Sequence, residues 1–189
     1  MYYPDLETFK EKARRGNLVP VYNEIIADLE TPVSAYLKLG NCPYAYLLES
    51  AETADGIGRY SFIGANPSVI FQSRGEKALI TRKGETKELR SQNPLMLLKV
   101  LLKNYRPVED ETLPPFSGGA VGYFSYDSVR FFENLPEDNL DELGLPDLYF
   151  MISDTLIIFD RLLNKIKLVA NAHIDGDPEV SYREAVSRI

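Results

Sequence analysis

The sequence predicts an α+β fold, with mainly antiparallel sheets and flanking helices in a single domain. Short segments rich in apolar, β-branched and aromatic residues follow one another along the chain and are separated by turn residues. They do not alternate regularly with helices, as the strands of a parallel sheet would, and no internal repeat occurs. The length of 189 residues suits one sizeable core and leaves room for a small second lobe.

Two short helices with a strand between them are predicted first. Asp5 is a typical N-cap and Gly16 follows the apolar pattern that begins there, so the first helix lies between them. Residues 18–25 form the predicted strand. Thr31-Pro32 combines an N-cap with proline at the first helical position, and this second helix should end at Gly40.

Several consecutive strands and a third helix come next. The expected strands are Tyr44 to Leu48, Ser61 to Ala65, Ser68 to Ser73, Lys77 to Thr81 and Thr86 to Leu89, the last two joined by a hairpin turn at Lys83-Gly84. The first of these is an unbroken aromatic and aliphatic run, which predicts a buried strand. Pro94 to Leu102 carries unbroken helix formers and is the predicted third helix.

The second half of the chain contains two acidic stretches. Pro107 to Pro115 and Glu133 to Gly144 should be solvated loops, the first of low order. Leu148 to Phe159 and Ile166 to Ala172 flank turn residues and predict an antiparallel hairpin. Asp177-Pro178-Glu179 begins a last helix that has no stop signal before the sequence ends, as expected of a chain cut from a longer one.

Charge and apolar patterning exclude several classes of partner. The net charge of −7 and the isoelectric point near 4.9 argue against nucleic acid, whose binding depends on clustered Lys and Arg. No apolar run approaches the roughly 20 residues that span a bilayer, so no membrane partner is expected. Because no secretion signal is recognisable and Cys42 is the only cysteine, we expect a cytoplasmic protein without a disulfide.

Common catalytic and phosphate-binding patterns are absent from the sequence. His173 has no second histidine or nearby thiol to complete a metal site. The glycines of Gly118 to Tyr123 suggest a phosphate loop, but no Lys, Ser or Thr follows at the required offset, which favours close backbone packing instead. Asp154 and Asp160 flank an apolar strand, which favours structural roles over acid–base catalysis. We therefore expect no catalytic residue, metal ion or cofactor in this chain.

The segment Leu47-Leu48-Glu49-Ser50 is the best candidate binding site. An acid and a hydroxyl directly follow an apolar strand, and strand ends are common places for sites. A carboxylate accepts from an ammonium, a hydroxyl serves a carboxylate, and apolar neighbours form a wall, so the combination suits an amino acid. The spacing alone favours the alternative that the strand ends in solvated turn residues, which continue through 51–58.

Five segments occur in an order that is specific only in combination. They are Leu47 to Ser50, Gly58 to Gly64, Phe116 to Asp127, Leu145 to Leu148 and Asp154 to Asp160. Together they resemble the N-terminal domain of anthranilate synthase component I, a family of chorismate-utilising enzymes. The resemblance covers nearly the whole chain.

The resemblance implies what the parent enzyme does. It would convert chorismate and ammonia, delivered by a glutamine amidotransferase subunit, into anthranilate and pyruvate on the way to tryptophan. The chorismate site, the magnesium-binding acids and the catalytic histidine would lie in a C-terminal catalytic domain that this chain lacks. The chain alone should therefore be inactive and hold no cofactor, with magnesium expected in the missing domain.

The resemblance also implies a regulatory site at which L-tryptophan inhibits the enzyme. The acid and the serine of the family's motif map onto Glu49 and Ser50, and Leu48 should flank the ligand. The next strand should complete this wall with Arg59, Tyr60 and Ser61. Expected partners are thus L-tryptophan, the amidotransferase subunit and the chain's own catalytic domain.

Two other interpretations remain open. Component I of aminodeoxychorismate synthase, in the folate pathway, belongs to a related family that holds tryptophan as a structural ligand, although Glu49 favours anthranilate synthase. The second alternative is a non-catalytic module that docks the amidotransferase subunit and binds no small molecule.

Overall fold

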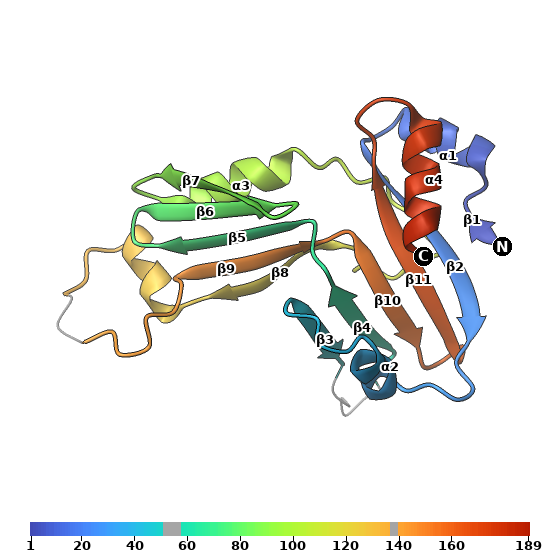
Figure 1. Ribbon diagram of the computed structural model, residues 1–189, viewed down its shortest axis with the longest axis horizontal. Helices are drawn as coiled ribbons and strands as arrows, with labels where there is room; N and C mark the ends of the chain where they lie inside the picture. Colours follow the sequence, from blue (N-terminus) through green and yellow to red (C-terminus); the bar gives the residue numbers. More distant parts are fainter. Residues whose placement is uncertain (51–57, 137–139) are drawn as a thin grey trace. The chain divides into compact units, whose positions relative to one another are not determined.

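The computed structural model describes residues 1–50, 58–136 and 140–189, which form two compact units with one antiparallel sheet each (Figure 1). Unit 1 comprises residues 1–67, 105–119 and 153–189, and unit 2 comprises residues 68–104 and 120–152. These two sheets with their helices confirm the predicted α+β class. None of the described helices is both long enough and apolar enough to cross a membrane.

The sheet of unit 1 has six strands. Their order is β1 (Tyr2–Tyr3), β2 (Leu18–Ile26), β11 (Lys165–His173), β10 (Thr155–Asp160), β4 (Tyr60–Ala65) and β3 (Ala45–Glu49). The predicted hairpin at the C-terminal side is present, because β10 pairs with β11 from Thr155 opposite Ala170 to Asp160 opposite Lys165. The prediction of a buried strand at 44–48 is wrong. β3 is the edge strand, and Leu48 keeps 41% of its surface exposed.

The helices of unit 1 begin where their N-caps predict. They are α1 (Leu6–Ala13), α2 (Pro32–Lys38) and α4 (Pro178–Arg188). Asp5 accepts the Thr8 N–H at 2.8 Å, and Asp177 accepts the Glu179 N–H at 2.9 Å. Thr31 forms a reciprocal capping box with Ser34. Each cap satisfies N–H groups that the first helical turn leaves without an intrahelical partner.

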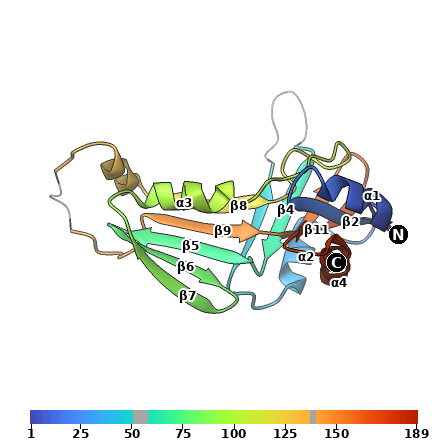
Figure 2. The ribbon, with the colours of Figure 1, turned by 90° about the horizontal axis from the view of Figure 1, so that it is seen from above.

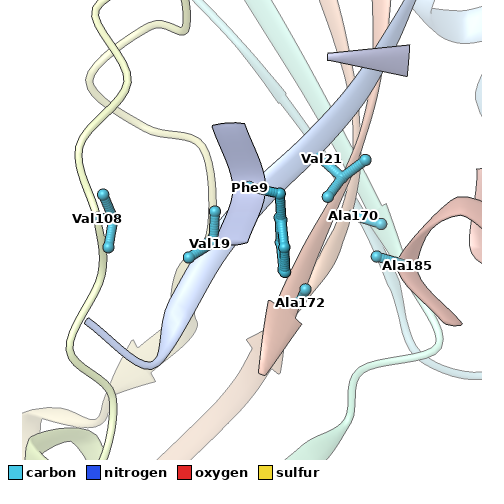
Figure 3. Close-up of a cluster of buried hydrophobic side chains, with 7 residues drawn as sticks. All are labelled: Phe9, Val19, Val21, Val108, Ala170, Ala172 and Ala185. Carbon is cyan, nitrogen blue, oxygen red and sulfur yellow. The ribbon is translucent and has the colours of Figure 1, made fainter. Parts of the chain in front are cut away.

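Helices cover one face of this sheet, which we term the helix-covered face. Here Phe9 of α1 and Ala185 of α4 pack on small and branched side chains of β2 and β11, all of them buried (Figure 3). The cluster consists of Phe9, Val19, Val21, Val108, Ala170, Ala172 and Ala185. Nearer the β3 edge, Ala35 and Tyr36 of α2 pack on Ile63, Phe159 and Ile166. The small residues of β11 leave the space that the aromatic ring of Phe9 fills.

The opposite face of the unit 1 sheet is covered by the later part of the segment 105–119, and we term it the loop-covered face, whereas Val108 packs in the cluster of the helix-covered face. Leu113 and Phe116 of this segment pack on Tyr22, Leu156 and Ile158. The acidic stretch 107–115 is a loop, as predicted, but not a solvated one of low order. Val108 and Leu113 are buried within it. Its Asp110 also receives a hydrogen bond of 2.6 Å from Lys12 of α1.

The sheet of unit 2 has five strands and one covering helix. The strand order is β7 (Glu85–Arg90), β6 (Lys77–Arg82), β5 (Val69–Arg74), β9 (Leu148–Ser153) and β8 (Gly119–Phe124). Helix α3 (Pro94–Lys103) runs along one face, with Leu98 and Leu101 buried (Figure 2). Lys83 and Gly84 have φ of 49° and 83°, as the predicted two-residue hairpin turn requires. A short 3₁₀ helix, η1 (Tyr126–Phe131), follows β8.

The apolar run 148–159 is not one strand, as predicted, but two. β9 pairs with β5 in unit 2, and β10 pairs with β4 and β11 in unit 1. Only Asp154 separates them, and its side chain forms an ion pair with Arg188 of α4. Both halves are buried strands, and the polar residues Ser153, Asp154 and Thr155 where they meet mark the place where the chain changes sheets.

Two of the three glycines in the segment 118–123, Gly118 and Gly122, pack closely, as predicted. A Cβ atom on Gly122 of β8 would lie 1.9 Å from the carbonyl oxygen of Tyr149 and 2.7 Å from the Cα of Phe150. A Cβ on Gly118 would lie 2.4 Å from Nδ2 of Asn171, which donates to the Ser117 carbonyl oxygen at 2.7 Å. These glycines allow backbone approaches that any other residue would prevent.

Candidate functional site

All the predicted site residues gather at one end of the unit 1 sheet, where β3 ends and β4 begins (Figure 1). Glu49 lies opposite Ser61 in the strand register. The Ser50 N–H donates to the Tyr60 carbonyl oxygen at 3.4 Å, and Arg59 directly precedes β4. The turn that the sequence places at 51–57 lies outside the described residues.

The pleat of the sheet separates these side chains onto two faces. Successive residues of a strand point to opposite faces. Leu48 shares the loop-covered face with its partner Phe62, whereas Glu49 shares the helix-covered face with its partner Ser61. A ligand that contacts both Leu48 and Glu49 must therefore reach around the edge strand β3 or its end rather than lie flat on one face.

Glu49 is held by a cation that the sequence motif does not include. Nη2 of Arg161 donates to Glu49 Oε1 at 2.8 Å and to Ser61 Oγ at 3.1 Å. The side chains of Arg161 and Glu49 are 37% and 40% exposed, and Ser61 is fully buried. The three residues form a small polar cluster at the solvent-accessible end of β3.

Arg59 is engaged within the protein. Its Nε and Nη2 donate to Asp160 Oδ1 and Oδ2 at 3.0 and 2.7 Å, and its guanidinium lies 4.8 Å from the centre of the Tyr60 ring. Asp160 also accepts the N–H groups of Leu162 and Leu163, each at 3.1 Å. Burial would raise the pKa of Asp160, but the bonds from Arg59 and Leu163 outweigh it, so this pKa lies below its ordinary value. Arg59 therefore stabilises the sheet end.

Aromatic rings lie beside these polar groups on the loop-covered face. The centres of the Tyr60 and Phe62 rings are 6.1 Å apart. Phe116 meets Phe62 edge to face, with ring centres 5.1 Å apart. All three rings are partly buried against the core of this face. This group supplies an apolar surface of the kind that an indole ring prefers.

A second group of charged residues lies on the neighbouring strands. Glu24 of β2 forms ion pairs with Lys165 and Lys167 of β11, and Lys167 Nζ lies 4.8 Å from the centre of the Tyr22 ring. The hydrogen bonds from Lys165 and Lys167 lower the pKa of Glu24. Because Lys167 is almost fully buried, these contacts compensate for the desolvation of its charge.

The other residues considered for chemistry have structural contacts. His173 is exposed, and the centre of its ring lies 5.5 Å from that of Tyr105. Within residues 1–50, 58–136 and 140–189, no three His, Cys, Asp or Glu side chains lie close enough to hold a metal ion. Asp154 and Asp160 pair with Arg188 and Arg59, respectively.

Sequence reasoning did not assign Arg161 or Phe116 to the site, because both are distant from Leu47 to Ser50 along the chain. Arg161 contacts Glu49 across 112 positions of sequence, and Phe116 reaches Phe62 from the segment that crosses the loop-covered face. One signal was present for Arg161. It directly follows the strand that ends at Asp160, and the ends of neighbouring antiparallel strands can supply one site.

Comparison with known proteins supports the predicted family. No protein-family model matches the chain. Anthranilate synthase component 1 of Acetivibrio thermocellus is 39% identical over 190 residues, which are 100% of this chain and 38% of that protein. The protein of the same name from Synechocystis sp. is 40% identical over 195 residues, again 100% of this chain and 38% of that protein.

A solved structure shows the same fold. The crystal structure of anthranilate synthase component I from Streptococcus pneumoniae matches with a TM-score of 0.53 at 24% identity, covering 86% of this chain and 35% of that chain. The chain thus spans less than two fifths of the length of the curated relatives described above. Over its whole length, the chain is homologous to a part of anthranilate synthase component I, the family that its sequence motifs predict.

Proposed function

We propose that the chain is the N-terminal regulatory portion of an anthranilate synthase component I and contributes one wall of a feedback site for L-tryptophan. The parent enzyme makes anthranilate and pyruvate from chorismate and ammonia in the cytoplasm. A glutamine amidotransferase subunit supplies the ammonia. The whole-chain similarity to relatives of this name supports the proposal.

Catalysis belongs to the remainder of the parent in this proposal. The chain alone is inactive, and the chorismate site with its magnesium lies in the catalytic domain that the chain does not contain. The limited coverage of the relatives supports this division, since more than half of their length lies outside the aligned part. The aminodeoxychorismate synthase alternative is disfavoured by the names of these relatives.

The observation that carries the proposal is the accessible carboxylate of Glu49 at the end of an edge strand. Arg161 engages one of its oxygens. A carboxylate has about four acceptor positions, so Glu49 keeps the capacity to accept from the ammonium of an amino acid. Leu48 and the ring of Tyr60, on the loop-covered face at the same end of the sheet, offer apolar surface. Ser50 completes the site as a donor to the ligand carboxylate.

Inhibition requires that tryptophan bind one arrangement of the parent better than another. A ligand shifts such an equilibrium only through this difference in affinity. Coupling energies between allosteric sites are typically about 1–3 kcal/mol. Removing a single ligand contact is therefore enough to abolish most of the inhibition while the catalytic domain keeps its activity.

The absence of tryptophan from the sequence allows a direct binding test. The fluorescence of free L-tryptophan is followed while purified chain is added. We expect a saturable blue shift that is lost in Glu49→Gln and Ser50→Ala. A spectrum unchanged at high protein concentration would contradict binding by this chain alone, and inhibition of the full-length enzyme would then be measured.

The full-length enzyme distinguishes the alternatives. Glu49→Ala should relieve tryptophan inhibition and leave uninhibited turnover nearly unchanged, whereas undiminished inhibition would remove Glu49 from the site. Release of anthranilate identifies the parent as anthranilate synthase, and release of aminodeoxychorismate identifies the rival enzyme. A pull-down with the amidotransferase subunit tests the docking alternative.

A further inference from the structure

Arg161 lies at the proposed tryptophan site although it is not part of the motif. Its main-chain N–H donates to the Arg59 carbonyl oxygen at 2.9 Å, which fixes its backbone beside the start of β4. β4 lies between β10 and β3 in the sheet. Because neighbouring strands are about 4.8 Å apart, the side chain must extend across β4 to reach Glu49, and its Nη2 does so.

The guanidinium of Arg161 is anchored at one corner and accessible elsewhere. Both side-chain hydrogen bonds, to Glu49 and to the buried Ser61, are made by Nη2. Among the residues that the structure describes, no partner bonds to Nε or Nη1. Arg59 differs, because two of its nitrogens already bond to both oxygens of Asp160. Among the described contacts, Arg161 therefore keeps the N–H groups of two nitrogens for a ligand, whereas Arg59 keeps those of Nη1 alone.

A contacting Glu and Arg pair complements a free α-amino acid. The ligand carries its ammonium and its carboxylate on the same carbon, so the two charges lie side by side. Glu49 and Arg161 present the opposite charges side by side, with 2.8 Å between the bonded atoms. The N–H groups on Nε and Nη1 of Arg161 can each donate a charge-assisted hydrogen bond to the ligand carboxylate.

We infer that Arg161 binds the carboxylate of the amino acid while Glu49 binds its ammonium, so that this pair selects the zwitterion. The inference rests on the proposed tryptophan site and adds the group that the motif lacks. This role of Arg161 explains why the exposed Arg161–Glu49 ion pair also has a hydrogen bond to the buried Ser61. An exposed pair that served only the fold would stabilise it little and would not need the Ser61 anchor.

Three indole compounds test this inference on the purified chain. L-tryptophan carries both charges, tryptamine lacks the carboxylate, and indole-3-propionate lacks the ammonium. Their intrinsic fluorescence is followed during titration with protein. We expect each analogue to bind the wild-type chain about tenfold or more weakly than tryptophan, because each leaves one charged side chain without its ligand partner.

Each substitution should remove the preference of the chain for tryptophan over one of the two analogues. In Arg161→Gln, tryptophan should bind no better than tryptamine, whose own affinity should be unchanged or increased. In Glu49→Gln, tryptophan should bind no better than indole-3-propionate. Lys165→Gln is the matched control, because it removes one positive charge from the next strand of the same sheet end and should leave all three affinities unchanged.

The outcomes separate this inference from the proposed function. If the wild-type chain binds tryptophan and Arg161→Gln still prefers tryptophan to tryptamine, Arg161 does not bind the ligand carboxylate. Only this inference then fails. If wild-type chain binds none of the compounds, the tryptophan site itself fails for this chain. Arg161→Lys, which keeps the charge, should recover part of the preference, and circular dichroism checks that each variant is folded.

Discussion

Asp160 joins three elements through one carboxylate. Its side chain is 2% exposed and accepts hydrogen bonds from Arg59, Leu162 and Leu163. It thereby ties the residue before β4 to the turn between β10 and β11. These hydrogen bonds compensate for the loss of water around the carboxylate, so Asp160 can remain charged although it is almost fully buried.

Asp160→Asn should lower the free energy of unfolding by about 2–3 kcal/mol, because the Arg59 guanidinium loses its charged partner. Urea denaturation followed by circular dichroism measures this change. Asp127→Asn is the control. Its ion pair with Arg130 is exposed, so its removal should cost less than about 1 kcal/mol. Equal effects of the two substitutions would contradict a special role for Asp160.

The stabilisation by Asp160 should also depend on pH. Folding lowers the pKa of Asp160, so the stabilisation is complete above the unfolded value of about 3.9 and is lost as the pH falls through the folded value. The difference in unfolding free energy between the wild type and Asp160→Asn should therefore shrink between pH 6 and pH 3. A constant difference over this range would show that the charge does not contribute.

Among the elements, helix starts were the most predictable from sequence. Asp5, Thr31 and Asp177 each cap a helix as expected, because a cap depends on residues only a few positions apart. The four strands predicted between Ser61 and Leu89 also lie within one residue of their predicted bounds at each end. The helix starts and these strands were predictable because each depends on residues that are close together in the sequence.

Sheet membership and the partners of the site were not predictable in the same way. Ser153, Asp154 and Thr155 interrupt the run 148–159, but such a break does not show that β9 and β10 belong to different sheets, and the apolar β3 proved to be an edge strand. At the candidate site, the motif identified Glu49 but not Arg161, whose contact arises only when β10 and β4 pair. Such features depend on long-range pairing, which short windows of sequence do not report.

Close packing of β8 on β9 predicts the effect of Gly122→Ala. The added methyl group would overlap the carbonyl oxygen of Tyr149, so β8 must move away and the unfolding free energy should fall by about 2–4 kcal/mol. Thermal denaturation measures the loss. Gly40→Asn is the control, since Gly40 has open space and a φ of 65° that asparagine tolerates, and it should cost under about 1 kcal/mol. Comparable losses would contradict the packing explanation.

At the scale of the whole molecule, the chain passes between the two units at 67/68, 104/105, 119/120 and 152/153. The segment 105–119 therefore belongs to unit 1 although its sequence neighbours on both sides belong to unit 2. Its Leu113 and Phe116 complete the core of the loop-covered face. No single cut in the sequence separates the units as two intact pieces.

Leu113→Ala should act on unit 1 although the residue lies between two segments of unit 2. The cavity beside Tyr22 and Leu156 should cost about 2–4 kcal/mol. Native-state hydrogen exchange locates the effect, with faster exchange expected in β2 and β10 and little change in β5 and β6. Faster exchange of the same size in β5 and β6 would contradict the assignment of this segment to unit 1.

Only Asp154 lies between β9 and β10, and its main chain is itself engaged, because its carbonyl oxygen accepts the Asn171 N–H at 2.6 Å. An inserted residue would have to displace this bond or a residue of β10, whose register is fixed by pairing with β4 and β11. Insertions should therefore be costly at this point. The exposed positions 133–136 and 140–144 carry no such restriction, and a fluorescent label or affinity tag is best inserted there.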